Sequence, residues 1–518
     1  MSHKEELANS VIVTAEQMRQ IESQLFAAGM PVPALMEKAA TLVAQKVEQE
    51  YPLSNTPSIG VLVGPGHNGG DALVVARELH LAGYSVLRYQ PLEKLKELTA
   101  QQANYCDYLG IVCHKAIEQL KDCDVIIDGL FGFGLERSLS GEIAEAVDQV
   151  NQWPQPTVSI DIPSGIHTDT GEVLGTAIQA KRTFCLGLWK LGFFQSSALT
   201  YLGEVECLNF GIPEFAITTV LSSSPKRRLI TPVKARSTLP LNRPLTTHKY
   251  QQGHLLLICG SYHYAGSAIL AGLGAKASGV GMLSIAVPKS IKSLLVNHLP
   301  ESLILDCPET DNGAIAELSA VATNFSRYNA IACGPGLTLD SITPLREVLG
   351  ASCPILLDAD GLNLLAQLGT TAQLSQRQFP TLLTPHAGEF KRLFPELSEI
   401  LSKDPLNALE RAATQAQATI LFKGARTAIA EPEGTLQIIG DSTPALARGG
   451  SGDVLTGLIG GLLAHSAQQN RSLVNAVTAG AWWHSQTGIF VANRRSQLGV
   501  DAFTLSQNLI PAIAQQSP

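Results

Sequence analysis

The alternation of short β-rich runs with helical stretches is the feature that most constrains how this chain can fold. From residue 58 the runs IGVLVG, YSVLRY, VIIDGL and VSIDIP are separated by stretches with apolar residues at helical spacing. Parallel strands need crossover helices of this kind, so the rhythm predicts a mostly parallel sheet. A second series of the same type opens with GHLLLICGS at residues 253–261. We therefore predict an α/β protein with a doubly wound parallel-sheet domain followed by a second α/β domain.

The domain limits are predicted from the point at which the alternation of strand-like and helical segments becomes irregular. A chain of 518 residues exceeds what one hydrophobic core usually serves. After GEVECLNFGIP (residues 203–213) comes a segment rich in serine, proline and basic residues, which is typical of a linker. We predict an N-terminal domain over residues 1–221, a linker over 222–244 and a C-terminal domain over 245–518. Thr14 and Gln17 have the spacing of a capping box and predict the start of the first helix.

Composition narrows the class of partner. A formal net charge of −8 disfavours a broad electrostatic grip on nucleic acid, whereas small anions can still bind at helix ends. The N-terminus has no apolar signal region, and no later run is long enough to span a bilayer. The nine cysteines are scattered without a CxxC pair, which indicates reduced core residues. We expect a soluble, cytoplasmic protein that acts on small molecules, with no nucleic-acid or membrane partner.

Polar residues follow several strands of the first half. The strand at 59–63 runs into GPGHNGGD, where bare backbone amides at a helix end suit a phosphate; a tight turn is the alternative. Asp128 and Asp161 each close a strand, and the carboxyl ends of neighbouring parallel strands share one crevice. Asn68, Asp128 and Ser164 offer hard oxygen ligands for a cation, and Asp161 is available for proton transfer. For each aspartate taken singly, capping or turn formation is the alternative.

The second half has its strongest signal in ARGGSGDVLTGLIGGLLA, residues 447–464. Successive amides before an apolar helix form an anion hole, and Asp453 can take a proton from a hydroxyl that attacks a phosphate. Tight packing of small residues is the alternative. The KGART turn, which begins at Lys423, adds cations at a strand end. His386, Asp358 and Asp360 remain divided between ligand contacts and structural roles.

The motifs of the first half resemble the epimerase domain of NAD(P)H-hydrate repair enzymes. They are LMEKAA, GPGHNGGD, DGLFGFGL, DIPSGIHTDTG, WKLGFF and GEVECLNFGIP. The resemblance implies a Rossmann-like domain in which Asp161 contacts the reacting nicotinamide and in which Asn68, Asp128 and Ser164 bind K⁺. This chain has His67 where the family usually has asparagine. The implied contacts to the hydrated cofactor are His67, Asn68, Gly69, Gly70, Asp71, Gly132, Phe133, Gly134, Leu135, Glu136, Arg137, Ser138 and Asp161.

The motifs of the second half resemble the dehydratase domain of the same enzymes, which has a ribokinase-like fold. They are GSYHYAGSAILAG, CGPGL, LLDADGLNLL, TPHAGEF, KGART and GGSGD. Departures from the family pattern are Gly266–Ser267, where GA is usual, and Arg448. The resemblance implies that Asp453 is catalytic. It also implies contacts to the hydrated cofactor from Ser267, Gly336, His386 and Asp453, and to the nucleotide from Lys423, Gly424, Ala425, Arg426, Thr427 and Gly452.

Together these resemblances predict a bifunctional enzyme that repairs hydrated nicotinamide cofactors. It would interconvert the epimers of NADHX and NADPHX and then dehydrate the (S) epimer, with ADP as phosphoryl donor and Mg²⁺ on the phosphates. Related enzymes suggest a homo-oligomer. One alternative is a kinase for a vitamin alcohol, since ribokinase-like folds also phosphorylate such hydroxyls. Another is a ligand-sensing or scaffold protein without turnover, against which Asp128 and Asp161 argue.

Overall fold

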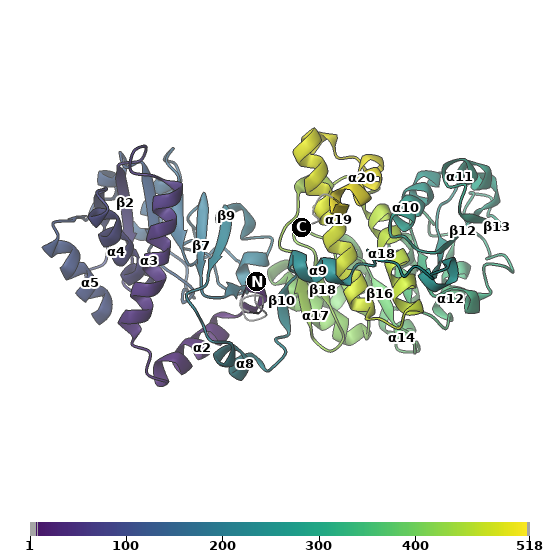
Figure 1. The fold of residues 1–518 in the computed structure, drawn as a ribbon, viewed down its shortest axis with the longest axis horizontal. Coiled ribbons are helices and arrows are strands. Elements are labelled where there is room, and N and C mark those ends of the chain that lie inside the picture. Colours follow the sequence, from purple (N-terminus) through teal and green to yellow (C-terminus); the bar gives the residue numbers. More distant parts are fainter. Residues whose placement is uncertain (1–6, 8, 515–518) are drawn as a thin grey trace. The chain divides into compact units, whose positions relative to one another are not determined.

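The computed structural model describes residues 7 and 9–514 and contains two compact units, Met1–Leu229 and Ile230–Pro518. Each unit has a central sheet with helices on both faces (Figure 1). The predicted α/β class is therefore confirmed. The boundary between the two units, after Leu229, falls within the segment 222–244 that was predicted as a linker. This segment also contains β10 (Arg227–Leu229) and α9 (Pro232–Thr238).

The first unit is built on a seven-stranded parallel sheet in the order β4-β3-β2-β5-β6-β7-β9. The chain runs outward from β2 to one edge and then returns to β5 and runs to the other. The switch point therefore lies between β2 and β5, where ligand sites of doubly wound sheets form. The strands are β2 (Ser58–Val63), β3 (Ser85–Tyr89), β4 (Val112–His114), β5 (Val125–Gly129), β6 (Thr157–Ile160), β7 (Arg182–Leu186) and β9 (Glu204–Leu208).

Helices cover both faces of this sheet because each carries an apolar stripe. The predicted capping box is confirmed: Thr14 Oγ1 accepts from Gln17 N at 3.2 Å, and Gln17 Oε1 accepts from Thr14 N at 3.0 Å. A short parallel pair of β1 (Ile12–Val13) and β8 (Trp189–Lys190) forms a separate sheet. The helices are α2 (Ala15–Ala27), α3 (Val32–Glu50), α4 (His67–Leu81), α5 (Glu97–Tyr108), α6 (Glu142–Val150), α7 (Leu199–Leu202) and α8 (Glu214–Leu221).

The strands of the second unit run in the order β19-β18-β17-β16-β15-β14-β11-β12-β13. The pairs from β17 to β13 are parallel, but β17, β18 and β19 form an antiparallel edge that the sequence pattern did not predict. The strands are β11 (His254–Ile258), β12 (Met282–Pro288), β13 (Leu303–Cys307), β14 (Ala330–Cys333), β15 (Ile355–Leu357), β16 (Thr381–Leu383), β17 (Thr419–Phe422), β18 (Ala428–Ala430) and β19 (Leu436–Ile438).

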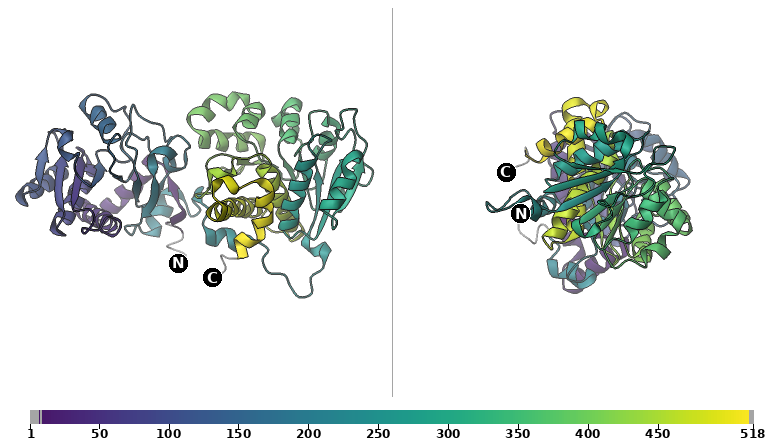
Figure 2. Two further views of the ribbon diagram at one scale, coloured as in Figure 1. Left: turned by 90° about the horizontal axis from the view of Figure 1, so that it is seen from above. Right: turned by 90° about the vertical axis from the view of Figure 1, so that its right-hand side faces the viewer.

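Helices form a layer on each face of this second sheet (Figure 2). The yellow helices α18 (Ser451–Gln468) and α19 (Leu473–Arg495) lie on one face, and the green helices near residue 400 lie on the other. The remaining helices are α10 (Ala265–Ala277), α11 (Lys292–His298), α12 (Ile342–Leu349), α13 (Asp360–Leu368), α14 (Thr370–Leu374), α15 (Ala387–Leu393), α16 (Ser398–Lys403), α17 (Pro405–Ala416) and α20 (Ala502–Ala514).

The structure also tests the predicted burial of the cysteines and the predicted absence of a membrane-spanning segment. All nine cysteines are free thiols, but Cys113 on edge strand β4 is exposed and Cys207 is half-buried, so the core interpretation was wrong for Cys113. None of the helices within residues 9–514 is long and apolar enough to cross a bilayer.

Two candidate active sites

The first unit holds a cavity of about 800 Å³ whose lining includes residues that follow β2, β5 and β6. The helix α4 begins at His67, so the predicted glycine-rich turn already forms the first helical turn. Gly69 and Gly70 pack inward instead of lining the cavity: a Cβ atom would lie 1.9 Å from Gly64 O at one and 2.5 Å from Met36 Cε at the other. The predicted residues that line the cavity are His67, Asn68, Asp71, Gly132, Phe133, Gly134, Leu135, Glu136, Arg137 and Asp161.

A buried ion pair fixes Asp161 at the cavity wall. The Lys190 Nζ donates to Asp161 Oδ1 at 2.6 Å, and Phe133 N donates to Oδ2 at 3.0 Å. The Asp161 backbone has φ +69°, a left-handed conformation that costs a non-glycine residue about 1–2 kcal/mol. Burial opposes the charge on Lys190, but the Asp161 carboxylate outweighs it and raises the pKa of the amine. Asp161 is therefore held in place by a buried cation and a backbone amide.

Asp128 and Ser164 come together beside this wall, as the neighbouring strand ends predicted. Asp128 Oδ1 accepts from Ser164 Oγ at 2.6 Å, and its Oδ2 accepts from Ser164 N at 2.9 Å and Ser159 Oγ at 2.8 Å. Ser164 Oγ also lies 3.2 Å from the carbonyl oxygen of Phe131. Burial raises the pKa of Asp128, and these donors oppose that rise. Asn68 is nearly buried, and its Nδ2 has no hydrogen-bond partner.

Two residues of this site, Glu22 and Lys190, were missed by the sequence reasoning. Glu22 lies on α2, outside every quoted motif, and it lines the cavity. Burial raises its pKa to about 7, although Lys190 opposes the rise. The signal for Lys190 was its position in WKLGFF, where a lysine in an apolar run suggests a buried, paired charge.

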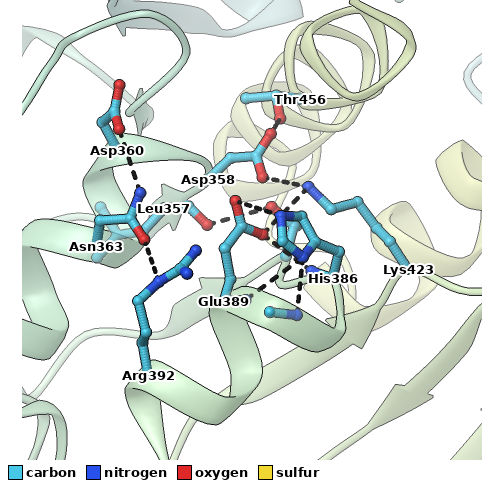
Figure 3. A network of polar contacts seen from close by, with 11 residues as sticks. Leu357, Asp358, Asp360, Asn363, His386, Glu389, Arg392, Lys423 and Thr456 are labelled. Carbon is cyan, nitrogen blue, oxygen red and sulfur yellow. Dashed lines mark hydrogen bonds and ion pairs between the residues drawn. The ribbon is translucent and has the colours of Figure 1, made fainter. Parts of the chain in front are cut away.

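The second unit is organised around another buried aspartate (Figure 3). Asp358 directly follows β15; its Oδ1 accepts from Lys423 Nζ and its Oδ2 from Thr456 Oγ1, both at 2.6 Å. Lys423 also lies 3.8 Å from Glu389 Oε2. Although burial opposes the charge, the Lys423 ammonium holds the pKa of Asp358 below its ordinary value. Asp358, for which the sequence allows a ligand contact or a turn, thus anchors the cation of the KGART turn.

Asp453 lies in the first turn of α18, as predicted, beside the Asp358–Lys423 pair. Burial raises its pKa to about 6; a hydrogen bond with Ser267 and the charge of Lys423 oppose this rise, while Asp358 adds to it. A Cβ atom on Gly452 would lie 3.6 Å from Lys423 Nζ. The helix start therefore places bare backbone, a cation and a proton-accepting carboxyl group in one place.

The glycines before and within α18 have two roles: some allow close helix packing, and others expose the backbone at the helix start. A Cβ atom on Gly457 would lie 1.8 Å from Ala271 O, so this glycine is required for the close packing of α10 on α18. By contrast, Gly449 faces open space and Gly450 has φ +86°, which fits the anion-hole interpretation of the helix start. Arg448 donates from Nη1 to Leu498 O at 2.8 Å, so its guanidinium is partly engaged by backbone.

The other predicted residues of this unit gather around the same point. Gly336 has φ +67°, and a Cβ atom there would lie 3.0 Å from Ser267 Cβ. His386 is the N-cap of α15, and its Nδ1 accepts from Gly388 N at 2.9 Å, so this nitrogen has a structural role. Lys423 N donates to Pro385 O at 2.8 Å, which ties the two segments together. Residues 424–427 form the turn between β17 and β18, where the Nε of Arg426 is buried without a partner.

Comparisons with known proteins agree with this division into two sites. The family model described as YjeF-related protein N-terminus matches residues 32–192, and the one described as NAD(P)H-hydrate dehydratase matches residues 255–511. The bifunctional NAD(P)H-hydrate repair enzyme Nnr of Synechocystis sp. is 54% identical over 504 residues, which cover 97% of this chain and 95% of that protein. This chain belongs to the bifunctional NAD(P)H-hydrate repair enzyme family. The resemblance seen in the motifs is thereby confirmed.

Further members of the repair enzyme family match with similar coverage. The Nnr protein of Thermosynechococcus vestitus is 49% identical over 97% of this chain and 97% of its own length. A crystal structure of the ADP/ATP-dependent NAD(P)H-hydrate dehydratase from Bacillus subtilis, co-crystallised with ATP and Mg²⁺, is also similar. It is 34% identical with a TM-score of 0.47, over 54% of this chain and 95% of that one.

The buried pair of the first site gives a stability prediction. Lys190→Met leaves the Asp161 carboxylate buried without its cation, and breaking such a pair costs about 3–5 kcal/mol. We expect the urea-unfolding transition of the first unit to lose that much free energy of unfolding. The matched control is Lys181→Met, since Lys181 is exposed and should change stability little. Equal stabilities of the two variants would contradict the role of the pair.

Proposed function

We propose that the first unit interconverts the (R) and (S) epimers of hydrated NADH and NADPH, and that the second unit dehydrates the (S) epimer with ADP. Membership of the repair enzyme family along the whole chain supports this assignment. The observation that carries it is the presence of two separate carboxyl groups, Asp161 beside the buried Lys190 and Asp453 beside the half-buried Lys423, each in a site suited to a phosphate-bearing ligand.

In the first site Asp161 is suited to accept a proton from the ring hydroxyl of the substrate. Lys190 donates to one oxygen of the carboxylate, and the Phe133 amide fixes its second oxygen. A Cβ atom at position 132 would lie 3.1 Å from both Asp161 Oδ2 and Asn68 Oδ1, so a larger residue there would push on both side chains. The cavity of about 800 Å³ is in the range of small-molecule and cofactor sites. Exclusion of water there strengthens each of these electrostatic contacts.

The donor set near the first site fits a K⁺ ion. Asp128 Oδ1, Ser164 Oγ and the Phe131 carbonyl are neighbouring hard oxygens, and the carboxamide of Asn68, which is 9% exposed, offers its Oδ1 as a further oxygen. Asn68, Asp128 and Ser164 would hold the ion. When bound, it would supply positive charge next to the cofactor phosphates and to the loop at residues 132–138.

In the second site Asp453 takes the proton of the ring hydroxyl as that oxygen attacks the terminal phosphorus of ADP. The amides of Gly449, Gly450 and Gly452, at the positive end of α18, and the Lys423 ammonium stabilise the charge on the transferring group. The electron pair of the ring nitrogen then expels phosphate, and loss of a proton from the adjacent ring carbon restores the dihydronicotinamide. Bound Mg²⁺, held mainly by the nucleotide phosphates, would neutralise their charge.

Single substitutions in the full-length chain should separate the two activities. Asp161→Asn should slow interconversion of the resolved epimers about 10²–10⁴-fold, because a general base is lost, and should leave ADP-dependent dehydration of the pure (S) epimer unchanged. Asp453→Asn should do the reverse. Chromatography of the epimers and the absorbance of the reduced nicotinamide measure the two rates. An Asp453→Asn variant with full dehydratase activity would remove this residue from the mechanism.

The pH dependence of dehydration follows from the state of Asp453. The group must be ionised to accept a proton, so kcat/KM for the (S) epimer should fall as the pH drops below about 6 and level off above it. Asp360→Asn should move this midpoint down, because the Asp360 carboxylate raises the pKa of Asp453. Ser267, Asp358 and Lys423 also act on this group and stay unchanged in that comparison. A flat profile between pH 5 and 7 would contradict the assignment.

A further inference from the structure

The cavity of the first unit is lined by carboxyl groups other than the Asp161 base. Glu22 from α2, Asp71 from α4 and Asp161 after β6 all line it. The fully buried Lys190 makes its ion pair with Asp161. Glu22 and Asp71 have no ion pair among the residues that the structure describes. Of these three carboxyl groups, only Asp161 has an ion-pair partner among the described residues.

Glu22 and Asp71 keep a proton more readily than an ordinary carboxyl group does. A carboxyl group that loses water and gains an anionic neighbour tends to keep its proton. Burial raises the pKa of Glu22 to about 7, with Lys190 opposing the rise and Asp161 adding to it. Burial raises the pKa of Asp71 well above its ordinary value, and both Asp161 and Glu22 add to that rise. Near neutral pH the cavity thus holds a carboxyl group that keeps its proton for part of the time next to the Asp161 side chain that is paired with Lys190, which is the usual composition of an acid–base pair.

We infer that Glu22 is a second catalytic residue of the epimerase, the proton donor that acts together with the Asp161 base. The inference rests on the proposed function of this site. Asp161 takes the proton of the ring hydroxyl, a carbonyl group forms at that carbon, and the bond from this carbon to the ring nitrogen breaks with its electron pair going to nitrogen. Glu22 supplies the proton that the nitrogen then takes up. Rotation about the adjacent carbon–carbon bond and the reverse sequence close the ring with the opposite configuration.

This sequence returns both carboxyl groups to their starting states. On closure the nitrogen gives its proton back to Glu22 as it attacks the carbonyl, and Asp161 returns its proton to the carbonyl oxygen. No further reactant is consumed. Glu22 suits this exchange better than Asp71 because a group that titrates near the working pH both gives and reclaims a proton readily.

The test compares Glu22→Gln with Glu16→Gln in the full-length chain. Glu16 lies on the same helix with a mostly exposed side chain and does not line the cavity, so it controls for the loss of a negative charge from α2. We expect Glu22→Gln to lower kcat for epimerisation of the pure (R) epimer, without ADP, about 10²–10⁴-fold with a smaller change in KM. Glu16→Gln should epimerise like the unchanged chain. In both variants, the urea-unfolding transition of the first unit checks that this unit is folded, and ADP-dependent dehydration of the pure (S) epimer checks the second unit.

A pH profile separates proton donation from a structural role. In the unchanged chain epimerisation should fall as the pH rises through about 7, where Glu22 loses its proton, and this fall should persist in Asp71→Asn. In Glu22→Gln the residual rate should no longer show it. The other charged or titratable groups of the lining, which stay unchanged, are Arg19, His67, Lys96, Glu136, Arg137, Asp161 and Lys190.

The outcomes distinguish this inference from the proposed function. If the unchanged chain epimerises and Glu22→Gln keeps its kcat or its fall near pH 7, Glu22 is not the donor. If the fall disappears in Asp71→Asn instead, the donor is Asp71 and the inference is overturned. If the unchanged chain does not epimerise at all, the proposed function of the first unit is wrong, and the inference fails with it.

Discussion

Asp161 and Lys190 bring two opposite charges into a position with almost no solvent exposure, and the first site depends on this pair. Asp161 is 4% exposed and Lys190 is fully buried, so each charge needs the other to offset its loss of water. The lysine is positioned by the short β1–β8 pairing, and the aspartate by a left-handed turn after β6. The second unit has a similar ion pair: Lys423 Nζ lies 2.6 Å from Oδ1 of Asp358, which follows β15. In both units an aspartate at a strand end and a lysine paired with it fix the electrostatics of the site.

The two units differ in which carboxyl group remains for chemistry. In the first, the aspartate that is paired with Lys190 itself lines the cavity, while Glu22 and Asp71 tend to hold protons. In the second, Asp358 is occupied by Lys423 and Thr456, and the neighbouring Asp453 is left to titrate near pH 6. One arrangement suits proton exchange in both directions. The other suits a base that works once per phosphoryl transfer.

Local signals in the sequence predicted the parts of this account that depend on nearby residues. The Thr14 capping box, the strand-end positions of Asp128 and Asp161 and the helical-turn position of Asp453 follow from short spacings. Glu22 could not be found this way, because it reaches the cavity only through the packing of α2 and carries no motif. The antiparallel edge from β17 to β19 was missed because the alternation of short apolar runs does not encode strand direction.

The most direct measurement is to incubate the purified chain with a mixture of both epimers of hydrated NADH, ADP, Mg²⁺ and K⁺ and to follow the return of the reduced-nicotinamide absorbance. The account predicts complete conversion, because the first site feeds the (R) epimer into the stereospecific second site. Recovery that stops near the (S) fraction would contradict epimerisation by the first unit. No recovery with ADP or with ATP would contradict the repair function as a whole.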